Sequence, residues 1–217
     1  MNIAYLGHAC FAITSSVGIK IVTDPYQGVG YEMPQNVQAD IVTVSHEHFD
    51  HNYLSAVQGE YLVVKGEGEW KERGIVIRGK NTFHDDEQGR LRGNNTVFMF
   101  IIDGIRVTHL GDLGESCTQS VLNKIGETDV LLIPIGGKYT IDALQAKTYI
   151  ENIRPKVAIA MHYKPEQGTL DISAPDAFLS LFHGVIQAKG TQTLVLEDAQ
   201  TTKIVFMQTG ENICLKI

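Results

Sequence analysis

The sequence feature that most constrains this chain is a cluster of potential metal ligands at residues 46–51. His46, His48, Asp50 and His51 lie in this short run, which directly follows the apolar segment 40–45. Imidazole and carboxylate groups together suit a borderline cation such as Zn²⁺. An apolar strand that ends in such a turn would hold its ligands at a rigid edge. The cluster therefore predicts a metal site at the end of a strand.

Three further segments repeat this arrangement of a β-rich stretch followed by one ligand-type residue. Their final residues are His84, Asp112 and His162. Each of these residues alone would be an ordinary turn, surface or core residue, but a repeated strand-then-ligand pattern is much rarer by chance than a single case. Because a bound metal requires three or more ligands, we expect these side chains to converge on the 46–51 cluster.

The order His-x-His-x-Asp-His at 46–51, followed by His84, Gly111-Asp112 and His162, resembles the metallo-β-lactamase superfamily in spacing and residue type. Four flanking segments resemble one branch of it, the zinc-dependent hydrolases near the ascorbate-6-phosphate lactonases and, more distantly, the N-acylphosphatidylethanolamine phospholipases D. These segments are Leu6-Gly7-His8-Ala9, Thr23-Asp24-Pro25, Pro134-Ile135-Gly136-Gly137 and Met161-His162-Tyr163. The resemblance spans nearly the whole chain, and its motifs specify fold and metal site far better than substrate.

The resemblance implies an α/β (α+β) fold, a four-layer αββα sandwich formed by residues 1–217 as one domain. The pattern of strands in the front half and alternating helices and strands in the back half would alone predict only a mixture of both. The resemblance also implies two divalent metal ions, with Zn²⁺ favoured and Mn²⁺ or Fe²⁺ as alternatives. One ion would be bound by His46, His48 and His84, the other by Asp50, His51 and His162, and Asp112 would bridge them.

This ligand set predicts a metal-dependent hydrolase. Two metals roughly 3.5–4 Å apart share a water and lower its pKa toward neutrality. The bridging hydroxide, oriented by Asp50 or Asp112, would attack a carbonyl or phosphoryl centre of a small lactone, ester or phosphodiester. Two divalent ions carry more positive charge than two carboxylates and one hydroxide can neutralise. The small positive charge that remains favours an anionic substrate.

Substrate-binding residues are less constrained by the sequence. The candidates lie in the segments that follow the predicted strands, and they are His8, Arg90, Arg92, Lys138, Tyr139, Tyr163 and Lys164. Arginine binds phosphate or carboxylate in a bidentate way, whereas Lys and Tyr groups near the metals could stabilise an oxyanion. A solvated loop is the alternative for the two arginines. His8 could hydrogen-bond to a metal ligand instead of to substrate, and simple packing is its other alternative. His109 is either a support for the ligands or a packed strand residue.

The composition bears on partners and compartment. A net charge of −7 and the absence of a long Lys or Arg cluster argue against a nucleic-acid partner. Three dispersed cysteines without a CxxC pair predict neither a disulfide framework nor a thiolate zinc site. Neither a signal-peptide pattern nor an apolar run of the ~20 residues that span a bilayer is present. We therefore expect a cytoplasmic protein with a small-molecule substrate and no membrane contact; an oligomer is left open.

Three other functions are compatible with a metal site but are disfavoured by the sequence. A metal-dependent nuclease or phosphodiesterase acting on nucleic acid is disfavoured because no basic face is expected. A redox or non-catalytic metal protein is disfavoured because the resemblance places Glu in diiron redox members where this chain has His48. Hydrolysis of β-lactams is disfavoured because the flanking segments resemble another branch.

Local patterns predict the elements that would carry these residues. Two strands at 10–14 and 19–23 should form a hairpin, and the strands at 96–102 and 105–110 should form another across Asp103-Gly104, a dipeptide that type I′ turns prefer. Helices are expected at 52–58, 118–125, 140–153 and from 173 to about 182. The longest irregular stretch is expected at 85–95, where a functional loop is typical.

Overall fold

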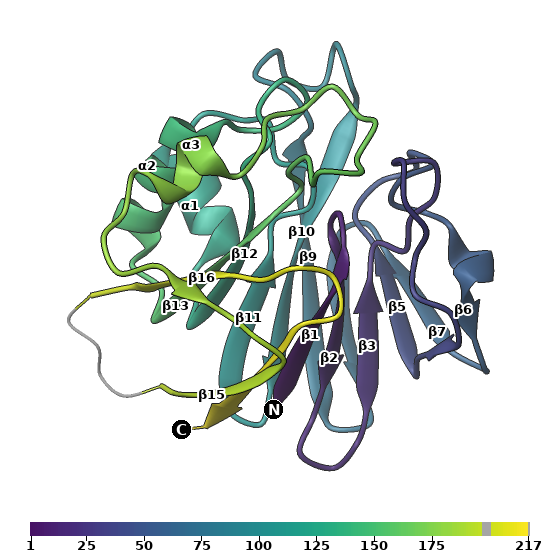
Figure 1. Ribbon diagram of the computed structural model, residues 1–217. Coiled ribbons are helices and arrows are strands. Elements are labelled where there is room, and N and C mark those ends of the chain that lie inside the picture. Colours follow the sequence, from purple (N-terminus) through teal and green to yellow (C-terminus); the bar gives the residue numbers. More distant parts are fainter. Residues whose placement is uncertain (197–200, 217) are drawn as a thin grey trace.

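The computed structural model describes residues 1–196 and 201–216, and two facing β-sheets carry most of its buried apolar side chains (Figure 1). Within these residues the first sheet has the spatial order β15 (Thr191–Val195), β17 (Asn212–Lys216), β1 (Asn2–Gly7), β2 (Cys10–Thr14), β3 (Lys20–Thr23), β5 (Ile41–Val44) and β7 (Leu62–Lys65). The second has the order β14 (Ile186–Gln187), β16 (Lys203–Phe206), β13 (Val157–Met161), β12 (Val130–Pro134), β11 (Ile105–His109), β10 (Asn94–Ile102), β9 (Ile75–Phe83) and β8 (Gly68–Glu72). A small sheet pairs β4 (Val37–Gln38) with β6 (Val57–Gln58).

The alternation of side chains along β2 explains how the first sheet is buried on both faces. Phe11 and Ile13 point into the main core between the two sheets. Cys10 and Ala12 point to the opposite face and join a second apolar cluster, which Tyr26 from the segment after β3 helps to cover. Because successive residues of a strand face opposite sides, one short apolar strand contributes to both clusters.

The second sheet combines an antiparallel part with a parallel part. Strands β9, β10 and β11 are antiparallel, and β11, β12, β13 and β16 are parallel. The predicted hairpin between β10 and β11 is confirmed, since Ile102 pairs with Ile105 and both turn residues, Asp103 and Gly104, have positive φ as a type I′ turn requires. Every residue of β12 and β13 is buried, as expected for parallel strands covered on both faces.

The α-helices lie outside the second sheet and pack their apolar faces on it (Figure 1). The predicted helices α1 (Gln119–Ile125) and α2 (Ala143–Ile153) are confirmed. The Thr118 side chain accepts a hydrogen bond from Val121 N, and Asp142 forms a capping box at the start of α2. These caps satisfy backbone donors that the first helical turn leaves free.

Two helix predictions need correction. Residues 52–58 form only a 3₁₀ turn, η1 (Leu54–Ala56), because Val57 and Gln58 pair with β4 as a strand. The expected helix up to about residue 182 is the single turn α3 (Asp176–Leu179). Ser173 does not cap it, because the N-cap position falls two residues later, at Pro175, which makes no side-chain cap. The outer face of the first sheet is thus covered by irregular chain, η1 and the small sheet.

Among the described residues, every helix is too short or too polar to cross a lipid bilayer.

Candidate metal centre

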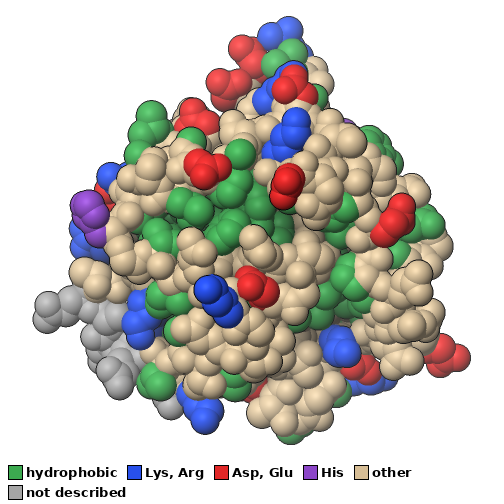
Figure 2. All heavy atoms as spheres, in the orientation of Figure 1, with side chains coloured by type: hydrophobic (Ala, Val, Ile, Leu, Met, Phe, Trp, Pro, Cys, Tyr) green, Lys and Arg blue, Asp and Glu red, His purple; other side chains and the backbone are tan. Residues whose placement is uncertain are grey.

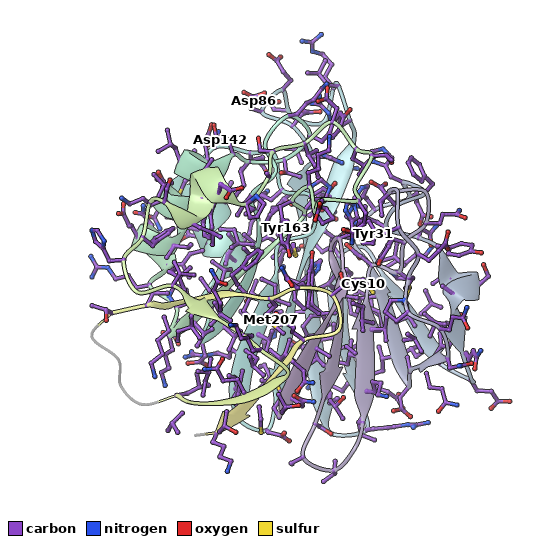
Figure 3. The ribbon with its side chains drawn as sticks, in the orientation of Figure 1. Cys10, Tyr31, Asp86, Asp142, Tyr163 and Met207 are labelled. Carbon is purple, nitrogen blue, oxygen red and sulfur yellow. The ribbon has the colours of Figure 1, made fainter. Side chains whose placement is uncertain are left out.

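Five strands of the two sheets end at one shared edge, which lies at the top of Figure 1. The segments that follow these strands carry the predicted ligands: residues 46–51 after β5, His84 after β9, Asp112 after β11 and His162 after β13. The segment after β1 adds the imidazole of His8. In Figure 3 this edge lies near the labelled Tyr31 and Tyr163, and the loop that carries Asp86 projects above it. The fold therefore places side chains from both sheets in one small volume.

The carboxylate of Asp112 lies at the centre of this volume. Its Oδ2 atom is 3.2 Å from Nε2 of each of His51, His84 and His162, and 3.9 Å from Nε2 of His46. The Asp112 backbone N–H donates to Asn95 Oδ1 at 2.9 Å, which fixes the turn. One carboxylate thereby contacts imidazoles from both sheets.

The ligand atoms form three overlapping groups, and within each group all of them lie within 4.8 Å of one another. The third group, His46, His51 and Asp112, joins the other two. We call His46, His48 and His84 the open group, because His48 is exposed to solvent. We call His8, Asp50, His51 and His162 the enclosed group, because its three imidazoles are at most 1% exposed. The structure thus brings all seven predicted ligands together and adds His8 to the second set.

Several buried polar atoms of the cluster have no hydrogen-bond partner within the described part of the chain. They are Nε2 of His46, Nε2 of His51, Nδ1 of His84, Nδ1 of His162 and Oδ1 of Asp112. An unsatisfied buried polar group costs about 1–3 kcal/mol, so such a concentration is unfavourable unless another group binds there. Imidazole nitrogens and carboxylate oxygens are donors that zinc accepts. The residues present therefore fit a divalent metal site.

Asp24 orients the His51 ring from behind. Its carboxylate accepts hydrogen bonds from His51 Nδ1 at 2.9 Å and from the Ser45 backbone N–H at 2.8 Å. Because Nδ1–H of His51 donates to Asp24, Nε2 is left free to face the centre. The Ser45 hydroxyl also donates to Asp24 and lies 3.0 Å from Nδ1 of His46, which likewise leaves His46 Nε2 facing inward.

Asp24 was recognised in the sequence only as part of a flanking segment, without a role. It follows β3 directly, as the ligands follow their strands, so the same strand-then-carboxylate pattern could have identified it.

His8 is held by its backbone in a left-handed conformation with φ 53°. Its N–H donates to the Tyr31 hydroxyl at 2.9 Å, and its C=O accepts from the Tyr5 hydroxyl at 2.9 Å and from the His162 N–H at 2.8 Å. Its Nε2 atom lies 3.2 Å from Oδ2 of Asp50. For His8 the sequence left open a hydrogen bond to a ligand, a contact with substrate, or simple packing. The structure places its ring against the predicted ligand Asp50.

Burial and mutual charge set the protonation of the cluster. Burial opposes ionisation of Asp112, but the charges of His162 and His51 outweigh it and hold the pKa of Asp112 well below its usual range. Burial would also lower the pKa of His51, yet Asp112 and Asp24 raise it well above the usual imidazole value. Burial, reinforced by the charge of His51, lowers the pKa of His46 to about 2. In the metal-free protein a proton therefore resides on His51.

A cleft of about 590 Å³ opens onto the cluster. Of the predicted substrate-binding residues, Arg92 and Tyr139 line it, together with Phe49 and Leu170 and several predicted ligands. Arg92 stacks on Tyr139, with its guanidinium carbon 5.5 Å from the ring centroid. These two residues therefore lie where a molecule near the ligands would contact them.

The remaining predicted substrate-binding residues lie elsewhere. Arg90 is exposed and forms an ion pair with Glu87 at 2.9 Å. Lys138 is exposed and pairs with Asp171.

Tyr163 and Lys164 line a separate pocket, where the buried Tyr163 hydroxyl donates to Met207 O at 2.7 Å (Figure 3). His109 is packed in the strand layer, with Nε2 bound to Ala9 O at 2.8 Å and Nδ1 accepting from Gly111 N. Neither ring nitrogen of His109 is available to the centre.

The irregular segment predicted after His84 is ordered around one side chain. The buried Asp85 carboxylate accepts hydrogen bonds from four backbone N–H groups, at 2.7–2.9 Å. The donors are Glu87, Gly89, Leu91 and Arg92. This ring of hydrogen bonds fixes the backbone that carries Arg92.

Comparison with known proteins agrees with this geometry. Residues 2–162 match the model of the β-lactamase superfamily domain. A UPF0173 protein of Pyrococcus furiosus is 33% identical over 202 residues, covering 82% of this chain and 89% of that protein. A UPF0173 metal-dependent hydrolase of Archaeoglobus fulgidus is 29% identical over 194 residues, covering 75% of this chain and 83% of its own length.

A solved structure gives the same result. The crystal structure of a proposed zinc-dependent hydrolase of the metallo-β-lactamase superfamily from Thermotoga maritima superimposes with a TM-score of 0.74 at 38% sequence identity. The match covers 95% of this chain and 97% of that one. The predicted metallo-β-lactamase fold is thus confirmed, with two mixed sheets and few helices. The chain belongs to the UPF0173 family of metal-dependent hydrolases within the metallo-β-lactamase superfamily.

Proposed function

We propose that the chain is a dinuclear hydrolase in which two divalent cations, zinc by preference, are held by the open and enclosed groups. His46, His48 and His84 would bind one, and Asp50, His51 and His162 the other. The observation that carries this assignment is the position of Asp112 Oδ2, which is 3.2 Å from imidazoles of both groups. A carboxylate in that position is suited to bridge two ions.

Bound cations would supply a water of lowered pKa and positive charge at the attacked oxygen. Asp112 and Asp50 are ionised carboxylates at the cleft floor, and each would accept a hydrogen bond from the attacking water and so orient it. The Tyr139 hydroxyl could donate to an oxyanion at the cleft wall. None of the residues that line the cleft is Ser or Cys, so the proposed reaction uses water directly.

The proposed substrate is a small anionic lactone, ester or phosphodiester. The cleft volume of about 590 Å³ lies within the range typical of small-molecule sites. The positive excess of two dications over the carboxylates, together with Arg92, favours a negatively charged molecule. The flanking motifs near His8 and His162 make lactones of the ascorbate-6-phosphate type the first compounds to assay.

The test combines metal analysis with one substitution. We expect protein purified without added metal to carry close to two metal ions per chain and to hydrolyse at least one member of a panel of lactones, thioesters and phosphodiesters. Asp112→Asn, which keeps the side-chain shape, should lower metal occupancy and reduce hydrolysis by more than the ~10–100-fold typical of residues that only support ligands. Asp86→Asn, in the exposed loop above the cleft, is the matched control. Unchanged metal content and turnover in Asp112→Asn would refute the bridging role.

A further inference from the structure

Arg92 stands between two adjoining hollows. One is the cleft above the ligand cluster, and the other is a groove of about 500 Å³ that includes Lys65, Asn81 and Asn94 in its lining. Arg92 lines both hollows, as do Glu47 and His48. A molecule that extends from the cluster into the groove must therefore pass the Arg92 guanidinium.

The charge of Arg92 is not neutralised within the described residues. Its guanidinium forms neither an ion pair nor a hydrogen bond with any of them, whereas neighbouring cations are paired. Arg90 pairs with Glu87, Lys138 with Asp171, and Lys65 with Glu47. Arg92 thus differs from the other cations around the cleft, because its donors remain available.

Arg92 is nevertheless held in place. Its backbone N–H donates to Asp85 Oδ2 at 2.7 Å, and its guanidinium carbon lies 5.5 Å from the centroid of the Tyr139 ring. Lys138 Nζ lies 5.7 Å from the same centroid, but its charge is paired with Asp171, so Arg92 is the cation on this ring that is free to bind an anion among the described residues. A half-buried guanidinium stacked on an aromatic ring loses little freedom when it binds a ligand. The arrangement is that of a preorganised anion donor rather than of a solvated surface side chain.

We propose that Arg92 binds a carboxylate or phosphate group that the substrate carries in addition to the bond that is hydrolysed. This inference rests on the proposed hydrolase function, and it adds the class of substrate and the residue that selects it. Two dications would carry more charge than the Asp50 and Asp112 carboxylates offset, so an unpaired guanidinium beside them favours binding of a further anion. The planar guanidinium can bind either oxyanion through two parallel hydrogen bonds. The groove beyond Arg92 gives room for the rest of the molecule.

The test compares esters that differ only in the distal group. The probes are 4-nitrophenyl butyrate, which is neutral, mono-4-nitrophenyl succinate, which carries a carboxylate, and 4-nitrophenyl 3-phosphonopropanoate, which carries a phosphonate in place of a phosphate. With zinc-loaded enzyme we expect kcat/KM to favour the anionic esters. Arg92→Gln should reduce that preference by about 10- to 100-fold, the range for a lost hydrogen bond to a charged group, mainly through KM. The more affected anionic ester identifies the preferred oxyanion.

Two further variants keep the test specific. Arg90→Gln removes a guanidinium from the same loop but outside the cleft, so it should retain the wild-type preference. Arg92→Lys keeps the charge and loses the bidentate geometry, so its preference should lie between those of wild type and Arg92→Gln. An equal preference in Arg92→Gln and Arg90→Gln would overturn the proposal.

A binding measurement separates this proposal from the proposed hydrolase function. Calorimetric titration of succinate into zinc-loaded wild type, Arg92→Gln and Arg90→Gln requires no turnover. If no ester is hydrolysed, the reaction assignment fails, and the Arg92 site is then decided by succinate affinity alone. Weaker succinate binding only in Arg92→Gln supports the anion site, whereas equal binding in all three proteins refutes it.

Discussion

The open and enclosed groups both contact the Asp112 carboxylate but are built differently. In the open group His48 is exposed and the support for His46 is a serine hydroxyl. In the enclosed group His51 is held by the buried Asp24, and Asp50 is contacted by His8. Support of a ligand by a carboxylate fixes its orientation and raises its basicity. Similar ligands are therefore preorganised to different degrees in the two groups. Because its ligands are the better oriented, we expect the enclosed group to bind its cation more tightly.

Removing the metal should have the largest effect on stability, and adding zinc back tests directly whether the two groups differ in affinity. A ligand present at 1,000 times its dissociation constant stabilises the folded protein by about 4 kcal/mol, so chelation should lower Tm markedly. Calorimetric titration of the metal-free protein with Zn²⁺ should then resolve a tighter and a weaker site. Two sites of equal affinity would contradict the assigned difference between the groups.

The next effect concerns the support of the enclosed group. Asp24→Asn keeps the shape of the side chain but removes the charge that His51 Nδ1–H contacts, so we expect the tighter zinc affinity to fall by about 10- to 100-fold. Zinc titration of the variant measures this change. Asp171→Asn, at an exposed carboxylate that pairs with Lys138, serves as the control. If only the weaker zinc site changed, Asp24 would support the open group and not the enclosed group, which would contradict the assignment.

The folding stability of the metal-free protein should depend on pH, because histidines of the two groups have pKa values shifted in opposite directions. Burial lowers the pKa of His46 to about 2 and that of His8 to about 4, so the unfolded chain binds these protons more tightly. Stability should therefore fall as pH drops below the unfolded value of about 6.5, by on the order of 2 kcal/mol down to pH 5.5. His51, whose pKa is raised, contributes stability below about pH 6.5 that is lost as pH rises through its folded pKa.

These opposing trends predict that the metal-free protein is most stable near pH 6.5. Melting temperature measured against pH checks this maximum. Bound zinc should move the pH of maximum stability to a higher value, since the cation displaces protons from its ligands. A steady rise in stability well above pH 7 without metal would contradict the assignment of the proton to His51.

The smallest effect is expected at His8. His8→Ala removes the contact with Asp50, so the tighter zinc affinity should fall by roughly tenfold, the range of one hydrogen bond to a charged group. His8→Asn, which retains an N–H donor, should recover part of the loss. Zinc titration and urea unfolding of both variants separate a change in binding from a change in folding.

Much of the fold and of the cluster could be predicted because the strand-then-ligand pattern is local. β5, β9, β11 and β13 each precede a predicted ligand, and parallel strands bring their ends to one edge. Asp24 could have been singled out by the same pattern, but its partner His51, like the partner Asp50 of His8, depends on contacts between side chains that follow different strands. Arg90 and Arg92 could not be distinguished, because only the backbone path around Asp85 sends one outward and the other into the cleft.

The hydrogen-bond ring around Asp85 has a consequence for how relatives of this protein could diverge. Because a single carboxylate satisfies four backbone amides, the exposed side chains of Asp86, Glu87 and Leu91 take little part in holding the loop. Gly89 is an exception, since its φ of +79° and its close approach to Gly93 O require glycine. Substitutions at these three exposed positions should therefore accumulate among relatives at little cost to folding. Asp85 and Gly89 should vary far less, because together they keep the path of the backbone that leads to Arg92.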